Sequence, residues 1–187
     1  MRKYVFTICF FLLSSVAMMA APATTADTLS TEPDELPERT RYYKEKYEES
    51  YNSSFENVWS SIKEVLEEMG AHIATQKYSQ NDEGFYKGTI RSDAWVFSEG
   101  TDSTYRLLQK YSYDMKVIPG SIWVNGRLEF KFKVTEVSPD NVALVMTTKM
   151  SAHETYVTEI VHFWQSNGLL EKQFLESLNA KIAAKGN

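Results

Sequence analysis

Residues Ile122–Thr135 read IWVNGRLEFKFKVT and contain the clearest structural pattern in the chain. Apolar side chains or glycine recur at every second position, and charged or polar side chains fill most of the positions between them. A period of two predicts a β-strand with one face on a core and the other in solvent. Half-solvated strands are typical of antiparallel sheets, so an antiparallel sheet is predicted whose apolar face needs a cover.

Stretches on either side of this strand predict its neighbours. Val142–Met150 repeats the alternation after a turn at Ser138–Asn141. Alternation or β-prone composition predicts four more strands on the N-terminal side. These are Tyr43–Tyr51, His72–Tyr78, Phe85–Ser92 with an extension as far as Phe97, and Tyr105–Val117.

Two other stretches have the spacing of amphipathic helices. In Phe55–Met69 the apolar side chains share one helical face, and Ser53 with Glu56 predicts a capping box at its start. Gly70 predicts its end. The stretch Gly168–Ala184 has a comparable apolar stripe and supplies the cover that the sheet requires. Its stripe consists of Leu170, Phe174, Leu175, Leu178 and Ile182.

Residues Thr155–Gln165 fit either a helix or a strand, and the positions of Tyr156, Ile160 and Trp164 favour a helix that ends near Ser166–Gly168. The order of elements predicts an α+β fold. We expect an antiparallel sheet of about six strands packed against a long C-terminal helix, with one helix near the N-terminus.

The N-terminal residues have the three parts of a secretory signal. Arg2 and Lys3 precede the uncharged, mostly apolar stretch Tyr4–Met19, and small residues follow it. Cleavage after Ala20 and cleavage after Ala23 both fit this pattern. We therefore expect a signal peptide at residues 1–23, a flexible acidic linker at residues 24–41 and a single domain at residues 42–187.

The only cysteine, Cys9, lies inside the predicted signal peptide. It follows Lys3 too closely for a lipoprotein signal, so we expect no lipid anchor and no disulfide in the mature protein. The predicted location is the periplasm or the medium, without stable membrane insertion after cleavage.

The charge balance disfavours polyanionic partners. The chain has 20 basic and 25 acidic residues, and loss of Arg2 and Lys3 would leave 18 basic ones. No cluster of lysine and arginine stands out along the sequence. We therefore expect neither nucleic acid nor an anionic membrane surface as a partner.

No catalytic or metal-binding motif is visible in the sequence. The three histidines, His72, His153 and His162, lack the spacing of metal ligands. A nucleophile elbow and a phosphate-binding glycine loop are also missing from the sequence. We therefore predict a protein that is not an enzyme and has no cofactor or metal.

Aromatic residues supply the candidate binding sites. In the predicted strand Tyr105–Val117, one face could line a cavity for a hydrophobic ligand or could form ordinary core. The candidate ligand-binding residues are Tyr105, Leu107, Tyr111, Tyr113 and Met115. Trp95 and Phe97 precede a polar loop and are candidate partner contacts, although Trp95 could equally cap one end of the core.

Three short strings resemble small bacterial envelope proteins: Ser54–Trp59 at the start of a helix, Glu83–Ile90 in a hairpin, and Trp164–Glu171 before the last helix. They are similar to the repeated helix-grip domains of the C subunit of the outer-membrane barrel assembly machinery. That subunit is a lipoprotein with two such domains, whereas this chain has one domain and no lipidation site. The element order also resembles the Bet v 1/START-like superfamily, whose members often hold a hydrophobic ligand between sheet and helix.

These observations predict an exported, non-catalytic envelope module for binding or assembly, which contacts another protein through a sheet edge or an apolar patch. The alternative is a carrier of a hydrophobic small molecule in a cavity between sheet and helix.

Overall fold

The computed structural model describes residues 42–185, so the predicted signal peptide and linker lie outside the described residues. These residues form an α+β fold with a seven-stranded antiparallel sheet and three helices, one of them at the C-terminal end. The α+β prediction is confirmed, with seven strands in place of about six. The elements are β1 (Tyr47–Tyr51), α1 (Phe55–Glu68), β2 (Ile73–Gln80), β3 (Tyr86–Ser92), β4 (Trp95–Glu99), α2 (Thr101–Tyr111), β5 (Trp123–Ser138), β6 (Asn141–Glu154), β7 (Val161–Trp164) and α3 (Leu169–Lys185).

Strands β5 and β6 form a long hairpin at the centre of the sheet, with 16 and 14 residues. The strand order is β1-β6-β5-β3-β2. Further along the same hairpin, β4 pairs with β5 and β7 pairs with β6. Every one of these pairings is antiparallel.

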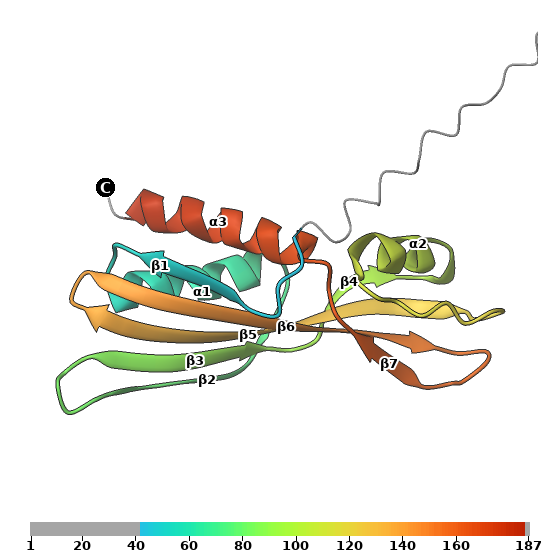
Figure 1. Cartoon of the computed structure of the whole chain (residues 1–187), viewed down its shortest axis with the longest axis horizontal. Coiled ribbons are helices and arrows are strands. Elements are labelled where there is room, and N and C mark those ends of the chain that lie inside the picture. Colours follow the sequence, from blue (N-terminus) through green and yellow to red (C-terminus); the bar gives the residue numbers. More distant parts are fainter. Residues whose placement is uncertain (1–41, 186–187) are drawn as a thin grey trace, which may run out of the picture. The chain divides into compact units, whose positions relative to one another are not determined.

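All three helices lie on one side of the sheet, which we call the inner face (Figure 1). The even-numbered residues of β5 from Leu128 to Val134 are buried there, as the alternation predicted. Phe174 of α3 contacts Phe130 and Phe132, with ring centroids 5.2 and 4.9 Å apart. The C-terminal helix therefore covers the sheet, and its whole predicted stripe is buried.

Helix α1 begins and ends close to the predicted residues. Its N-cap is Ser54, whose hydroxyl accepts a hydrogen bond from the Asn57 backbone N–H at 3.3 Å. The prediction of a Ser53–Glu56 capping box was wrong by one position, because Ser53 instead accepts a hydrogen bond from the Asn57 side-chain amide. After the helix, Gly70 has a φ of 75°, a left-handed conformation that glycine adopts without strain.

The predicted strand Tyr105–Val117 is wrong, because its first part belongs to helix α2. Among the side chains of this helix that the structure describes, Thr104 and Leu108 are fully buried, and they are four residues apart. That spacing brings them to one helical face against β4 and β5, whereas the alternating tyrosines suggested a strand by coincidence.

The favoured helix at Thr155–Gln165 is also wrong. Residues Val161–Trp164 form β7, and His162 and Trp164 turn to the inner face. Their rings meet the ring of Trp123 edge-on, at 5.3 and 5.7 Å between centroids. The spacing of apolar residues in this segment fits a helix and a strand equally well, and the aromatic contacts with Trp123 across the sheet favour the strand.

No helix within residues 42–185 combines the length and the apolar character that crossing a membrane requires.

Candidate functional site

A groove runs between helix α1 and the edge strand β2. It consists of two adjoining hollows of about 800 and about 490 Å³, and both are lined by Ser60 and Lys63. The larger hollow lies at the start of α1 and the smaller one at its end. We call the whole hollow the α1–β2 groove.

The larger hollow is walled by four aromatic rings. Phe55 and Trp59 of α1 are almost fully buried, and their ring centroids are 5.4 Å apart. Tyr78 of β2 meets Trp59 edge-on at 5.4 Å, and Tyr86 of β3 stacks on Phe55 at 5.3 Å. The two tyrosines are exposed, so they offer ring surface to a bound molecule.

Gly88 permits this arrangement of rings. It lies directly across from Tyr78 in the β2–β3 pair, and the Trp59 ring lies against its backbone. A Cβ at this position would overlap the Trp59 ring and approach the Tyr78 Cβ to 2.9 Å. Only glycine lets helix and hairpin approach closely enough to form the aromatic wall.

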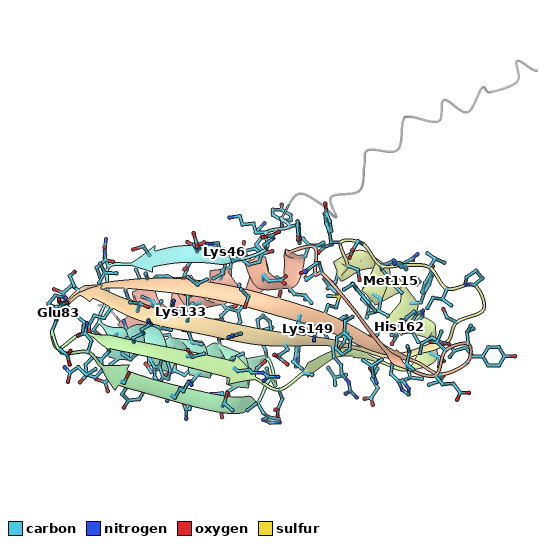
Figure 2. All side chains as sticks on the ribbon, turned by 60° about the horizontal axis from the view of Figure 1, so that its bottom comes forward. Lys46, Glu83, Met115, Lys133, Lys149 and His162 are labelled. Carbon is cyan, nitrogen blue, oxygen red and sulfur yellow. The ribbon has the colours of Figure 1, made fainter. Side chains whose placement is uncertain are left out.

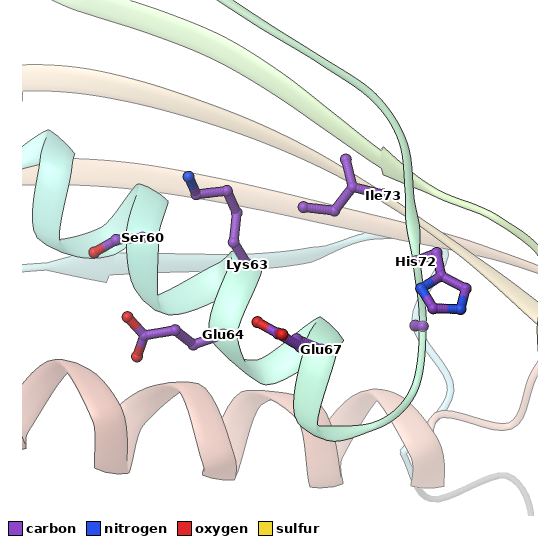
Figure 3. Close-up of a pocket in the computed structure, with 7 residues that line it drawn as sticks. Ser60, Lys63, Glu64, Glu67, His72 and Ile73 are labelled. Carbon is purple, nitrogen blue, oxygen red and sulfur yellow. The ribbon is translucent and has the colours of Figure 1, made fainter.

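The smaller hollow is polar. Figure 3 shows Lys63 of α1 and Ile73 of β2 pointing toward the space between the helix and the strand. Glu64 lies nearer α3, where the Lys185 ammonium donates a hydrogen bond to it at 2.7 Å and lowers the pKa of its carboxyl. Among residues 42–185, no group of three histidine, aspartate or glutamate side chains is arranged to hold a metal ion.

Strand β2 leaves one backbone edge unpaired beside this groove. Within the described part of the chain it forms strand pairs with β3 alone. Its eight residues include one charged side chain, Lys77, and no proline. The groove therefore combines free main-chain donors and acceptors with an aromatic wall.

Two buried carboxylates lie outside the groove. The first of them, Glu154, holds the backbone of the loop between β6 and β7 in place. It accepts hydrogen bonds from five backbone N–H groups and from the Thr158 hydroxyl. The donors are Ile122, Tyr156, Val157, Thr158 and Glu159. Burial alone would raise the pKa of Glu154, but these hydrogen bonds outweigh it and hold the pKa well below its usual range. The carboxylate fixes the β6–β7 loop, and its oxygens have no capacity left for acid–base chemistry.

The second buried carboxylate is Glu171, in the first turn of α3. Its oxygens accept hydrogen bonds from the hydroxyls of Ser166, at 2.8 Å, and Thr148. Burial raises its pKa, and these two hydrogen bonds only partly oppose that effect. Because the folded-state pKa lies above the unfolded value of about 4.3, this group favours folding below that pH. The stabilisation is lost as the pH rises through the folded-state pKa.

We expect Glu171→Gln to raise the free energy of unfolding at pH 8 by about 1 kcal/mol, because it removes the cost of a buried charge. Near pH 4 the variant should match the parent, since the carboxyl is then protonated. Thermal unfolding followed by circular dichroism at both pH values measures this. Glu176→Gln is the matched control on an exposed position of α3 and should change neither value. A Glu171→Gln variant that is less stable at pH 8 would contradict this account.

The predicted ligand-binding residues do not line the groove. Tyr105 and Leu107 belong to α2, at the opposite end of the sheet, and Tyr111 ends that helix. Tyr113 is exposed and stacks on Tyr43 at 4.0 Å. Met115 packs against a small core cluster around Leu108 and Trp123. The structure therefore brings these residues near α2 without placing any of them in either hollow.

The two predicted partner contacts lie at the edge of the core. Trp95 is half-buried, with its ring centroid 6.4 Å from that of Phe130. Phe97 is also half-buried and meets Tyr111 edge-on at 5.7 Å. Both residues pack against the main core cluster.

The sequence did indicate one part of the groove. Phe55 and Trp59 belong to the apolar stripe of the first helix, and the sequence predicts that this stripe faces the core. Tyr78 and Tyr86 had no pattern to identify them, because β2 is exposed along nearly its whole length. The glycine across from Tyr78 was the remaining signal, since glycine within a strand often marks a close approach.

Comparison with known proteins assigns no family. No model of a known protein family matches the chain, and no curated protein does. Among solved structures, the chain is similar to a DUF4468 family protein from Bacteroides ovatus. The match has 12% sequence identity and a TM-score of 0.28, and it covers 73% of this chain and 78% of that one. Likeness at this level defines neither fold family nor function.

Proposed function

We propose that this protein is a non-catalytic binding module that takes an extended segment of a partner protein along strand β2. The observation that supports this most directly is the unpaired edge of β2 beside the aromatic wall of the α1–β2 groove. A partner strand added to a sheet edge gains main-chain hydrogen bonds, and neighbouring hollows select its side chains.

The other edges of the sheet suit this role less well. Strand β1 has five residues and two of them are glutamates, which discourage pairing with another strand. Strands β4 and β7 have only five and four residues. By contrast β2 is long and bears a single charge, so it is the least protected of the outer strands.

The groove suggests what the partner segment contains. Side chains of a strand alternate, so every second residue of an added segment would face α1. An apolar or aromatic side chain fits beside Tyr78 and Tyr86. The proposed location is the bacterial periplasm or cell exterior, where the envelope proteins that the sequence resembles are found.

Site-specific photocrosslinking in the source cells tests this proposal. A photoreactive amino acid at Gln76 lines the groove, and the same probe at Asn179 on the exposed side of α3 is the control. We expect a discrete protein adduct from position 76 and none from position 179. Combining the Gln76 probe with Tyr86→Ala should lower the yield about tenfold, because exposed aromatic anchors dominate such interfaces.

Tyr156→Ala is the matched control for the loss of an exposed tyrosine, since Tyr156 lies in the β6–β7 loop and is 71% exposed. It should leave the adduct unchanged. Equal adducts from positions 76 and 179 would contradict the proposal. An adduct heavier by only a few hundred daltons, on the order of a lipid, would instead favour the carrier of a hydrophobic small molecule.

A further inference from the structure

The side of the sheet without helices, which we call the outer face, is strongly basic. Residues paired across neighbouring strands share a face, so the register identifies its side chains. Seven of them are basic and exposed: Lys77, Lys87, Arg91, Arg127, Lys131, Lys133 and Lys149. Three are acidic: Glu48, Glu99 and Glu129. Figure 2 shows Lys133 and Lys149 on this open side.

This face contrasts with the rest of a chain whose net charge is −5. Arg91 and Glu129 neutralise each other, through hydrogen bonds of 2.8 and 2.9 Å. Among the described residues, no ion pair involves Lys87, Arg127, Lys131 or Lys133. The basic side chains come from β2, β3, β5 and β6, so they spread over a plane. Neighbouring strands are about 4.8 Å apart, and successive residues on one face of a strand about 7 Å.

Apolar side chains border the basic residues on the same face. The register places Phe163 across from Ser151 and Ser151 across from Arg127, so all three point outward. Phe163 is 59% exposed, and the Lys149 ammonium lies 4.1 Å from its ring centroid. Val161 is exposed beside it and lies on the same face, because the register places it across from His153, which pairs with Asn125.

We infer that the outer face docks on an anionic lipid surface. The basic side chains of β3, β5 and β6 meet the phosphate groups, and Phe163 with Val161 enters the interfacial region. Surface binding of this kind scales with the apolar area buried plus the attraction to anionic lipid. The acidic remainder of the protein faces away from the bilayer, which leaves the helix side and the α1–β2 groove open.

Two features favour a lipid surface over a soluble polyanion. The cations are spread over four strands, which suits a planar partner better than a linear one. Exposed apolar side chains at the border contribute to binding only if the partner has an apolar layer. Single-stranded nucleic acid bound without sequence preference would need several rings for its bases to stack on, and Phe163 is the one aromatic ring that the register places on this face.

Vesicle co-sedimentation tests the inference. The protein is isolated from the compartment where it accumulates, and all variants share one N-terminus. We expect binding to vesicles of phosphatidylcholine mixed with phosphatidylglycerol, and much weaker binding to pure phosphatidylcholine. Lys131→Gln combined with Lys133→Gln should lower the partition coefficient about 30-fold, because each basic side chain contributes about fivefold. Phe163→Ser should lower it about tenfold.

Lys172→Gln is the matched control for the loss of a charge. This exposed lysine lies on α3, on the opposite side of the sheet, and its replacement should have little effect. Three outcomes would overturn the inference. The first is equal binding to neutral vesicles. The second is an effect of Lys172→Gln as large, per charge removed, as that of the Lys131→Gln, Lys133→Gln double variant. The third is tight binding to soluble polyphosphate together with no effect of Phe163→Ser. The last result would assign the face to a soluble polyanion.

Discussion

Replacing Phe174 with alanine is expected to lower the free energy of unfolding by about 3–5 kcal/mol. The side chain is fully buried and joins α3 to the sheet through Phe130 and Phe132. The truncation loses the burial of a large ring and leaves a cavity that the rigid sheet cannot close. Domains of this size are stable by only about 5–15 kcal/mol, so the variant should lose a large share of its stability. Urea unfolding followed by circular dichroism measures the change.

Phe163→Ala is the matched control, because it removes the same side chain from an exposed position on β7. It should cost less than about 0.5 kcal/mol. Similar losses of stability for Phe163→Ala and Phe174→Ala would mean that α3 does not cover the sheet through Phe174.

Gly168→Ala is expected to destabilise the protein by about 3–4 kcal/mol, through two separate causes. The residue has a φ of 90°, which a residue with a side chain adopts only with strain. An added Cβ would also collide with the Tyr42 carbonyl and the Tyr47 hydroxyl. That hydroxyl donates a hydrogen bond of 3.0 Å to the same carbonyl, so neither group can move away without breaking it. Thermal unfolding of the variant measures the sum of both effects.

Gly70→Ala separates the two causes. Gly70 also has a positive φ, of 75°, but no atom lies within 4 Å of an added Cβ. Its replacement should therefore cost only the backbone strain, about 1–2 kcal/mol. Equal losses for Gly70→Ala and Gly168→Ala would show that the contact with Tyr42 and Tyr47 has no energetic weight.

The central hairpin and the two long helices could be predicted because their side chains face two different environments. In β5 buried residues alternate with exposed or half-buried ones from Arg127 to Val134, and this alternation appears directly in the sequence. The helices α1 and α3 bury one stripe each and end near a glycine or the chain end. A pattern that repeats over many residues is robust to a single misreading.

Helix α2 and strand β7 could not be predicted because they are short and their environments are set by distant residues. In α2 the buried face consists of Thr104 and Leu108, and one of these is polar. Its tyrosines are only half-buried, so their alternation says little about the backbone. In β7 the deciding contact is with Trp123, which belongs to a strand far away in the sequence.

The candidate surfaces depend on the fold in the same way. The α1–β2 groove exists because Gly88 lets Trp59 approach the β2–β3 hairpin. No local sequence pattern predicts this contact. The outer face collects cations from strands between Lys77 and Lys149. No cluster of lysine and arginine stands out along the chain, so the linear sequence does not predict that the fold gathers these cations on one face.

The pairing of β1 with β6 constrains when the protein can fold. Tyr47 pairs with Met146, about 100 residues later in the chain, and such non-local contacts slow folding. The hairpin of β5 and β6 joins two strands that are consecutive in the chain, and its more local contacts are expected to form first. Strand β1 must wait for β6, and the apolar face of the sheet stays open until α3, the last element, covers it. The domain therefore reaches its native state only after α3 has been synthesised, and a nascent chain that stops short of Leu169 leaves the apolar face of its sheet uncovered.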